Sequence, residues 1–295
     1  MKRKESGFTM MEMLIVLGIL MLLVGLLIPA ITAVKNIAKE TKQKAQFSTI
    51  ELALAGFKND HGDYPPSNWP LPPDPGANYC GAQKLSEALL GWDLLGFHPD
   101  SAWRADGLDT AGGPMTYDPA KTRDLNADGI ADTMTERKGP YLELATANAF
   151  KLRDLLSNTN VLPNVANPIN TTLAPDTYVL CDAFKSKKVR LNNGKTVKAG
   201  APILYYRANT SQQIIRGRYN AQDNYPMILA KQQIDGRVHP LADGTNQYQF
   251  FYEQYIRDPK IEARLWPYRP DSYLLISAGA DGLYGTADDI RNFGN

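Results

Sequence analysis

The sequence has little cysteine, little histidine and no excess of either charge. Cys80 and Cys181 are the only cysteines in 295 residues, which excludes a zinc module built from several cysteines and a disulfide-dense scaffold. The three histidines form no pair at a metal-binding spacing. The 32 Lys and Arg against 31 Asp and Glu give a formal net charge of +1, so no global positive field attracts nucleic acid. The 43% hydrophobic and 21% charged residues are nevertheless typical of a folded protein.

The sequence patterns of common enzymes are also missing. The chain contains no G-x-S-x-G, H-E-x-x-H or P-loop pattern, and no G-x-G-x-x-G follows a predicted strand. Adjacent carboxylates such as Asp288 and Asp289 could do acid–base work in principle, but the neighbouring glycines favour a turn or a metal site. We therefore predict no catalytic residues and expect the protein not to be an enzyme.

The chain does have one long apolar run, residues 13–34, which carries no charge. At about 1.5 Å per helical residue, this run is long enough to cross a hydrocarbon core of about 30 Å. A secretory signal peptide would have a shorter apolar region of about 7 to 15 residues, followed by a cleavage site. We therefore expect a retained single membrane span. Because Lys2, Arg3 and Lys4 precede it, the N-terminus should be cytoplasmic and the rest of the chain should lie outside the cytoplasm.

An acidic residue, Glu12, stands at the edge of this apolar run. A carboxylate within a membrane helix costs about 2.5 to 3.5 kcal/mol near the centre and less toward the interface, so such residues are normally functional. The alternative is an interfacial glutamate that still contacts headgroup water. A short basic segment, then Gly7 and Phe8, come before it.

The whole N-terminal segment, KRKESGFTMMEMLIVLGILM, resembles the class III signal of type IV pilins and type II secretion pseudopilins. The resemblance implies that a prepilin peptidase cuts after Gly7, so that residues 1–7 are a leader, and that the new N-terminal Phe8 is N-methylated. It also implies an assembly role for Glu12, whose carboxylate would neutralise the Phe8 amine of a neighbouring subunit. Since Phe8 and Glu12 are four residues apart on one helix, a pair within one chain is an open alternative.

Pro29 lies inside the apolar helix, where it removes one backbone hydrogen bond. We expect a local break there, which the resemblance suggests is a hinge for assembly. The alternative is a harmless kink.

The order of the predicted elements, a helix first and antiparallel strands afterwards, indicates an α+β protein. We expect the helix over residues 8–59 and an exported globular domain over 60–295. A stripe at helical spacing should pack the second half of the helix on this domain. The stripe consists of Phe47, Ile50, Ala53, Leu54 and Phe57. His61 is interpreted as a solvated turn residue.

The exported domain has recognisable shorter elements. Its predicted helices are 84–91 and 147–158, and its predicted strands are 177–184, 202–209, 248–255 and 272–279, with a charged hairpin over 187–198 that turns at Asn193-Gly194.

Several fragments of the chain resemble the G-type major pseudopilin in particular. They are FKNDHGDYPPS, KGPYLEL, DAF with PILYYRAN, and SYLLISAGADGLYGTADDIRNF. The chain is longer than a usual pseudopilin, with insertions mainly at 68–136, 185–200 and 210–265, so its assignment as a major or a minor subunit stays open.

Two acidic loops are candidate calcium sites. The first has Asp124, Asn126, Asp128 and Asp132 around a glycine, in the order that opens an EF-hand-type loop, but it lacks the bidentate Glu, and a turn-rich loop without an ion is an equal alternative. The second contains Asp281, Asp288 and Asp289. The resemblance to the pseudopilin C-terminal calcium site favours Ca²⁺ at this second loop.

The two cysteines should both be exported, so a Cys80–Cys181 disulfide is predicted. The alternative is a pair of buried thiols.

The resemblance implies a structural function. The protein would be a pseudopilin anchored in the inner membrane by one span, with a periplasmic C-terminal domain, that assembles with other pseudopilins on the secretion platform into a periplasmic filament and helps to export proteins. The alternatives are a type IV pilin for adhesion or DNA uptake, and a membrane-tethered calcium-dependent binding module.

Overall fold

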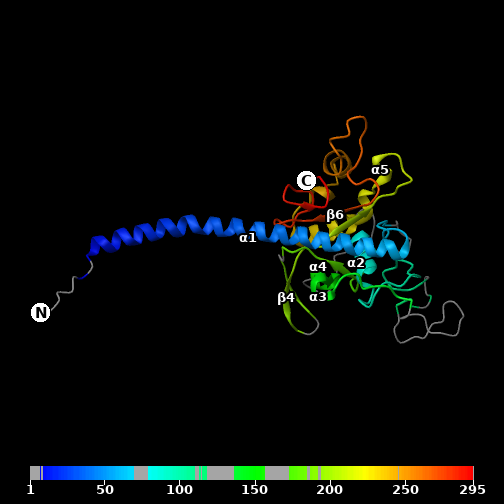
Figure 1. Ribbon diagram of the computed structural model, residues 1–295, viewed down its shortest axis with the longest axis horizontal. Coiled ribbons are helices and arrows are strands. Elements are labelled where there is room, and N and C mark those ends of the chain that lie inside the picture. Colours follow the sequence, from blue (N-terminus) through cyan, green and yellow to red (C-terminus); the bar gives the residue numbers. More distant parts are fainter. Residues whose placement is uncertain are drawn as a thin grey trace.

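The computed structural model consists of one very long helix and a globular part that packs against its C-terminal half (Figure 1). It describes residue 7 and residues 9–69, 79–109, 113, 115–117, 136–156, 173–184, 187–191, 194–244 and 246–294. The long N-terminal apolar helix and the small antiparallel sheets that follow it confirm the predicted α+β, pilin-like fold.

Helix α1 spans Met10–His61 and has 52 residues. Its C-terminus is well defined, because Gly62 adopts a left-handed conformation with φ of 85° and its N–H donates to the Lys58 carbonyl at 2.8 Å. All five residues of the predicted stripe are at most 5% exposed. The stripe therefore packs on the globular part, as the helical spacing predicted.

The break expected at Pro29 is not present, because α1 is continuous from Met10 to His61. A proline within a helix removes one backbone hydrogen bond, but the backbone hydrogen bonds before and after it keep the helix continuous. The expected local break is therefore absent in this conformation, whereas the role of Pro29 as a hinge during assembly stays a prediction.

His61 is also not a solvated turn residue. It is the last residue of α1 and is half-buried, with its ring 4.5 Å from that of Phe57 and 4.9 Å from that of Phe97. Its Nε2 lies 3.2 Å from the Tyr141 hydroxyl. Burial lowers the pKa of His61, which favours the neutral ring inside this aromatic group.

The central sheet has the order β5-β6-β7 and is antiparallel. Its strands are β5 (Leu204–Arg207), β6 (Tyr273–Ser277) and β7 (Ile290–Arg291). Alternate residues point to opposite faces. One face joins the core cluster that contains the α1 stripe; its residues are Tyr205, Tyr273, Leu275 and Ile290. The other face joins a second cluster; its residues are Leu204, Tyr206, Leu274 and Ile276.

The insertion 210–265 covers this second face, so the sheet is buried on both sides. Every residue of β6 is buried, which explains why its sequence, YLLIS, shows no alternation of apolar and polar residues. The insertion contains α5 (Ile215–Arg218), η1 (Ala221–Asn224), α6 (Tyr225–Asp235), η2 (Pro240–Ala242), α7 (Gln247–Gln249) and the π-helix η3 (Phe250–Tyr255).

The strand predicted at 248–255 is therefore wrong, because α7 and η3 occupy this segment. Its buried residues include Phe251, Tyr252 and Tyr255, a spacing that places them on one side of a helix. The aromatic residues favoured a strand by composition, but their periodicity was helical.

The remaining elements lie on the other side of α1 in Figure 1. They are α2 (Gly81–Leu90), α3 (Leu144–Ala147), β1 (Ala149–Lys151), α4 (Leu152–Leu156), β2 (Tyr178–Leu180), β3 (Lys187–Arg190) and β4 (Thr196–Ala199). Strands β1 and β2 pair, and β3 and β4 form the predicted hairpin. The helix predicted at 147–158 is only partly right, because β1 precedes α4 in this segment.

The packing of α1 predicts a large difference between two neighbouring leucines. Leu54 is 0% exposed and Leu52 is 75% exposed. Leu54→Ala should lower the free energy of unfolding by about 2 to 5 kcal/mol, because it leaves a cavity between α1 and the sheet. Leu52→Ala should change it by less than about 0.5 kcal/mol. Urea unfolding of the detergent-solubilised chain, followed by near-UV circular dichroism, measures both; equal effects would contradict this packing.

Candidate functional site

The N-terminal end of α1 carries the predicted assembly residue in an ordered cap. Glu12 accepts hydrogen bonds from the Thr9 backbone N–H at 2.9 Å and from its hydroxyl at 2.8 Å, and the Glu12 N–H donates to the Thr9 hydroxyl at 3.3 Å. This reciprocal arrangement is a capping box. Gly7 is exposed, and Phe8 lies outside the described residues. Within this chain, Glu12 is therefore held by Thr9, a partner that we did not predict.

The side chains of the apolar half of α1 are exposed in the part of the chain that the structure describes. The helix contains a segment of mean hydropathy 3.0 that is 0% buried, long and apolar enough to cross a membrane. Its exposed large side chains include Leu14, Ile19, Leu23 and Ile28, which point in different directions around the helix axis. A surface of this size and kind fits a lipid environment or the helices of other subunits.

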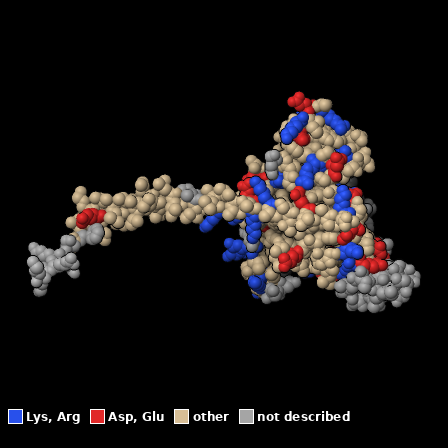
Figure 2. Space-filling model, in the orientation of Figure 1, with Lys and Arg blue, Asp and Glu red and all other residues tan. Residues whose placement is uncertain are grey.

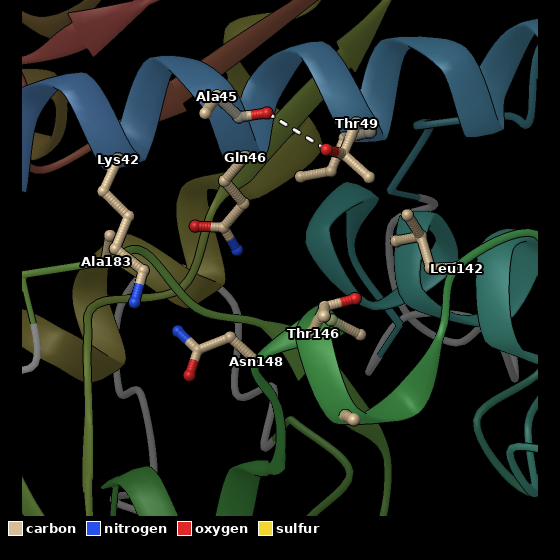
Figure 3. Close-up of a pocket in the computed structure, with 11 residues that line it drawn as sticks. Lys42, Ala45, Gln46, Thr49, Leu142, Thr146, Asn148 and Ala183 are labelled. Carbon is tan, nitrogen blue, oxygen red and sulfur yellow. Dashed lines mark hydrogen bonds between the residues drawn. The ribbon is translucent and has the colours of Figure 1, made fainter.

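A groove of about 560 Å³ lies between α1 and the segment around α3 (Figure 3). Lys42, Gln46 and Thr49 of α1 form one wall, and Thr146 and Asn148 lie opposite. Two side-chain amides that line the groove join α1 and the segment around α3 to the same backbone carbonyl. The side-chain amides of Gln46 and Asn148 both donate to the Cys181 carbonyl, at 2.9 and 2.7 Å. The groove thus lies along the interface between α1 and the end of β2.

The C-terminal loop brings the three predicted carboxylates of the second loop into one turn. The Asp288 carboxylate accepts from the Asp281 N–H at 2.9 Å and from the Thr286 hydroxyl at 2.6 Å. Gly279 is required here, since its φ is 62° and a Cβ would come within 2.2 Å of the Asp288 carbonyl oxygen. The two ends of the loop therefore meet, as the spacing of its acidic residues predicted.

Asp289 points inward from the same loop. Its Oδ2 accepts from the Gly285 N–H at 2.7 Å and from the Tyr255 hydroxyl, whereas its Oδ1 is buried without a hydrogen-bond partner. Burial raises the pKa of Asp289 to about 7. A buried carboxylate oxygen of this kind is an acceptor that a cation or a proton would satisfy.

Two positively charged side chains and a histidine of the insertion 210–265 contact this loop. Lys231 donates to the Gly282 carbonyl at 2.7 Å, and Arg237 donates to the Asp281 carbonyl at 2.8 Å. His239 accepts from the Tyr284 N–H at 3.0 Å. We did not predict these residues from the sequence, because each contact joins positions more than forty residues apart.

The fit of a calcium ion to the loop is incomplete. Within the described residues, no group of three or more His, Cys, Asp or Glu side chains could hold a metal ion. Two loop carbonyls already accept from Lys231 and Arg237, which leaves the unpartnered oxygen of Asp289 as the feature that suits a cation. The first predicted loop, with Asp124, Asn126, Asp128 and Asp132, lies outside the described residues.

The two cysteines are buried free thiols, so the predicted disulfide is not formed. Gly81, beside Cys80, is adjacent to the Tyr205 carbonyl, whereas Cys181 forms an isolated bridge with Pro202. The two cysteines thus lie beside different residues of the segment that leads into β5. The alternative of two buried thiols describes the structure.

A buried acid in α2 is a further residue that the sequence did not single out. Glu87 accepts from the hydroxyls of Tyr79 at 2.6 Å and Tyr117 at 2.7 Å, and also from Ser101. Burial raises the pKa of Glu87. These hydroxyls come from the segments before and after α2, so Glu87 fixes part of the insertion 68–136 to the core.

Comparison with known families identifies the N-terminal segment. Residues 2–28 match the model for the prokaryotic N-terminal methylation motif. This range contains Gly7, the Thr9–Glu12 capping box and most of the apolar run.

Curated relatives match a somewhat longer part of the chain. The type II secretion system core protein G of Aeromonas hydrophila and that of Pseudomonas aeruginosa are each 36% identical over 64 residues, 22% of this chain and 45% of the relative. The match thus spans less than half of either relative. No solved structure matches. Together, the methylation motif and these relatives support a pseudopilin or type IV pilin-like protein.

Proposed function

We propose that this protein is a structural subunit of a type II secretion-like periplasmic filament, processed after Gly7 and assembled through α1 to help export proteins. The observation that carries the proposal is the match to the methylation motif on a helix whose apolar half is exposed among the described residues. Its predicted partners are other pseudopilins, the prepilin peptidase and the inner-membrane secretion platform.

The exposed helix supports assembly for an energetic reason. Burying apolar surface stabilises by about 25 cal/mol per Å², so an exposed apolar helix is unfavourable in water. In the membrane, lipid covers it, and in a filament the helices of neighbouring subunits would cover it. The same surface therefore serves as a membrane anchor before assembly and as an interface after it.

The capping box gives Glu12 two separable contributions. Its carboxylate holds the first turn of α1 through Thr9, and its charge is available to a neighbouring subunit. Cleavage after Gly7 would place the new amine at Phe8, adjacent to Thr9. The acceptor and the new amine would then lie within one helical turn of each other, so that either a pair within the chain or a pair between subunits is sterically reasonable.

Processing provides the first test of the proposal. Mass spectrometry of the protein from its native membrane should find N-methylated Phe8 as the first residue. Gly7→Leu should accumulate the unprocessed chain, because a bulky side chain would occupy the cleavage position. Gly18→Leu is the matched control, since Gly18 is also exposed on the apolar segment and a Cβ added there would meet nothing within 4 Å. An intact Met1 in the native membrane would refute processing.

Two substitutions at Glu12 separate charge from capping. Glu12→Gln removes the charge but keeps a side chain that can close a capping box, whereas Glu12→Leu removes both. If pairing with the Phe8 amine drives assembly, both variants should be inserted in the membrane yet form few filaments. Electron microscopy and chemical crosslinking measure the filaments. Normal assembly of Glu12→Gln would show that the charge is dispensable and would contradict the pairing.

Calcium binding at the C-terminal loop is a second part of the proposal. It is supported by the unpartnered Oδ1 of Asp289 and by the closure of the loop through Asp281 and Asp288. These carboxylates with backbone carbonyls would hold the ion. Calcium accepts about six to eight oxygen ligands in a flexible geometry, which suits a loop that offers mixed ligands better than magnesium would.

Calcium should therefore raise the melting temperature of the solubilised chain. An ion that binds only the folded state stabilises it by RT ln(1 + [L]/Kd), about 2.7 kcal/mol at a hundredfold excess over Kd. Asp281→Asn should weaken this effect while its amide oxygen still accepts from the Leu283 N–H, a bond of 2.7 Å in the structure. If a chelator leaves the melting temperature unchanged and calorimetry detects no binding, Lys231 and Arg237 alone complete the loop.

A further inference from the structure

The β3–β4 hairpin has one apolar face and one basic face. Val189 is buried in the core, and Val197 packs against it. Because side chains alternate along a strand, the residues next to these valines in β3 and β4 point the other way. On that side Lys188, Arg190 and Lys198 are exposed. We call these three residues the basic hairpin face.

The pairing of the hairpin is electrostatically unfavourable by itself. Lys188 lies directly opposite Lys198 in the register, and like charges at opposed positions destabilise a strand pair. Residues 185–199 contain six Lys or Arg and no Asp or Glu, although the whole chain is nearly neutral. A segment that gathers charge of one sign at a cost in stability is suited to an anionic partner.

The hairpin lies at the edge of the globular part from which the apolar half of α1 projects (Figure 1). In Figure 2, Lys and Arg side chains gather at this same edge, beneath α1. The hairpin is attached there because the Ala183 N–H donates to the Gln43 side chain of α1 at 2.7 Å, four residues before β3 begins. Lys35, Lys39 and Lys42 are exposed on α1 in the same region.

The distance from the end of the apolar run suits contact with a membrane surface. Gln43 is nine residues beyond Val34, or about 14 Å along the helix axis. The headgroup layer occupies about 5 to 8 Å of that distance. The remaining gap is similar to the Debye length of about 8 to 10 Å at physiological ionic strength, so charges at the level of Gln43 would still act on the headgroups.

We propose that the basic hairpin face, together with Lys35, Lys39 and Lys42 of α1, binds the anionic phospholipid headgroups of the membrane that α1 spans. The inference rests on the proposed membrane anchoring. The contact would hold the globular part against the membrane before the subunit enters a filament, and assembly would have to break it.

Two observations favour lipid over an acidic protein surface as the partner. The hairpin lies at the edge of the globular part from which the apolar half of α1 projects, and the three α1 lysines lie between the apolar run and Gln43, so one anionic membrane surface could contact both groups. The pairing of Lys44 with Glu40 at 2.8 Å is the only salt bridge on α1 within the described residues 35–44, and it leaves the other three lysines of this stretch as net positive charge.

The test uses the full chain in vesicles with a fluorophore next to the basic hairpin face. Thr196→Cys introduces one exposed thiol opposite Arg190. Labelling is selective because both native cysteines are 0% exposed, and burial raises the pKa of Cys80 to about 12. The vesicles contain phosphatidylcholine, with or without about one third phosphatidylglycerol, and a trace of lipid with a nitroxide quencher on its headgroup.

We expect stronger quenching with phosphatidylglycerol than without it, and loss of the difference at about 1 M salt, where the Debye length falls to about 3 Å. Lys188→Gln/Arg190→Gln/Lys198→Gln should weaken headgroup contact by about fivefold for each removed charge. The matched control, Lys58→Gln/Lys138→Gln/Lys260→Gln, also removes three exposed charges but should keep the quenching, since Lys58 lies about 36 Å beyond Val34 along α1.

Equal quenching in neutral and anionic vesicles would overturn the inference. So would quenching that depends on protein density and not on lipid charge, because that outcome identifies an acidic surface of another copy as the partner. Carbonate extraction of the same vesicles tests anchoring separately. Chains that are extracted would contradict the proposed function, whereas inserted chains without charge-dependent quenching would contradict only the hairpin contact.

Discussion

The burial of β6 on both faces is the constraint on which the rest of the structure depends. One face receives the stripe of α1 that includes Leu54, and the other receives the helical insertion 210–265. A strand with only one covered face would leave Leu274 and Ile276 in water. The insertion is therefore part of the core and is not a peripheral addition to a smaller domain. It adds a third layer, so that α1, the sheet and the insertion are stacked in that order.

This third layer also determines the environment of the C-terminal loop. The loop follows β6 directly, and the insertion contacts it through Lys231, Arg237 and Tyr255. The loop is thus held by charged and hydroxyl groups from the segment 210–265. Any ion that binds there would add to contacts that already hold the loop. Removing the ion would therefore measure its own contribution to the free energy of unfolding, separately from that of these contacts.

The division of α1 into two halves links the fold to the proposed function. The second half packs against the globular part, whereas the first half is apolar around its whole circumference and is exposed. In the proposed function, the helix would therefore leave the bilayer and enter a bundle of like helices without disturbing the globular fold. The basic hairpin lies where these halves meet, so it is the part of the globular domain that would sense whether the helix is still in the membrane.

The sequence by itself determined the features that are encoded in neighbouring residues: the apolar run, the order around Gly7 and Glu12, the α1 stripe and the β3–β4 hairpin. Each depends on the spacing of residues that are close together in the sequence, and this spacing can be read without knowledge of the fold. Only the tertiary structure decided that the cysteines are buried free thiols and which groups Lys231 and Glu87 contact. Those outcomes depend on which distant segments pack together, since Lys231 and Gly282 are 51 residues apart in the sequence.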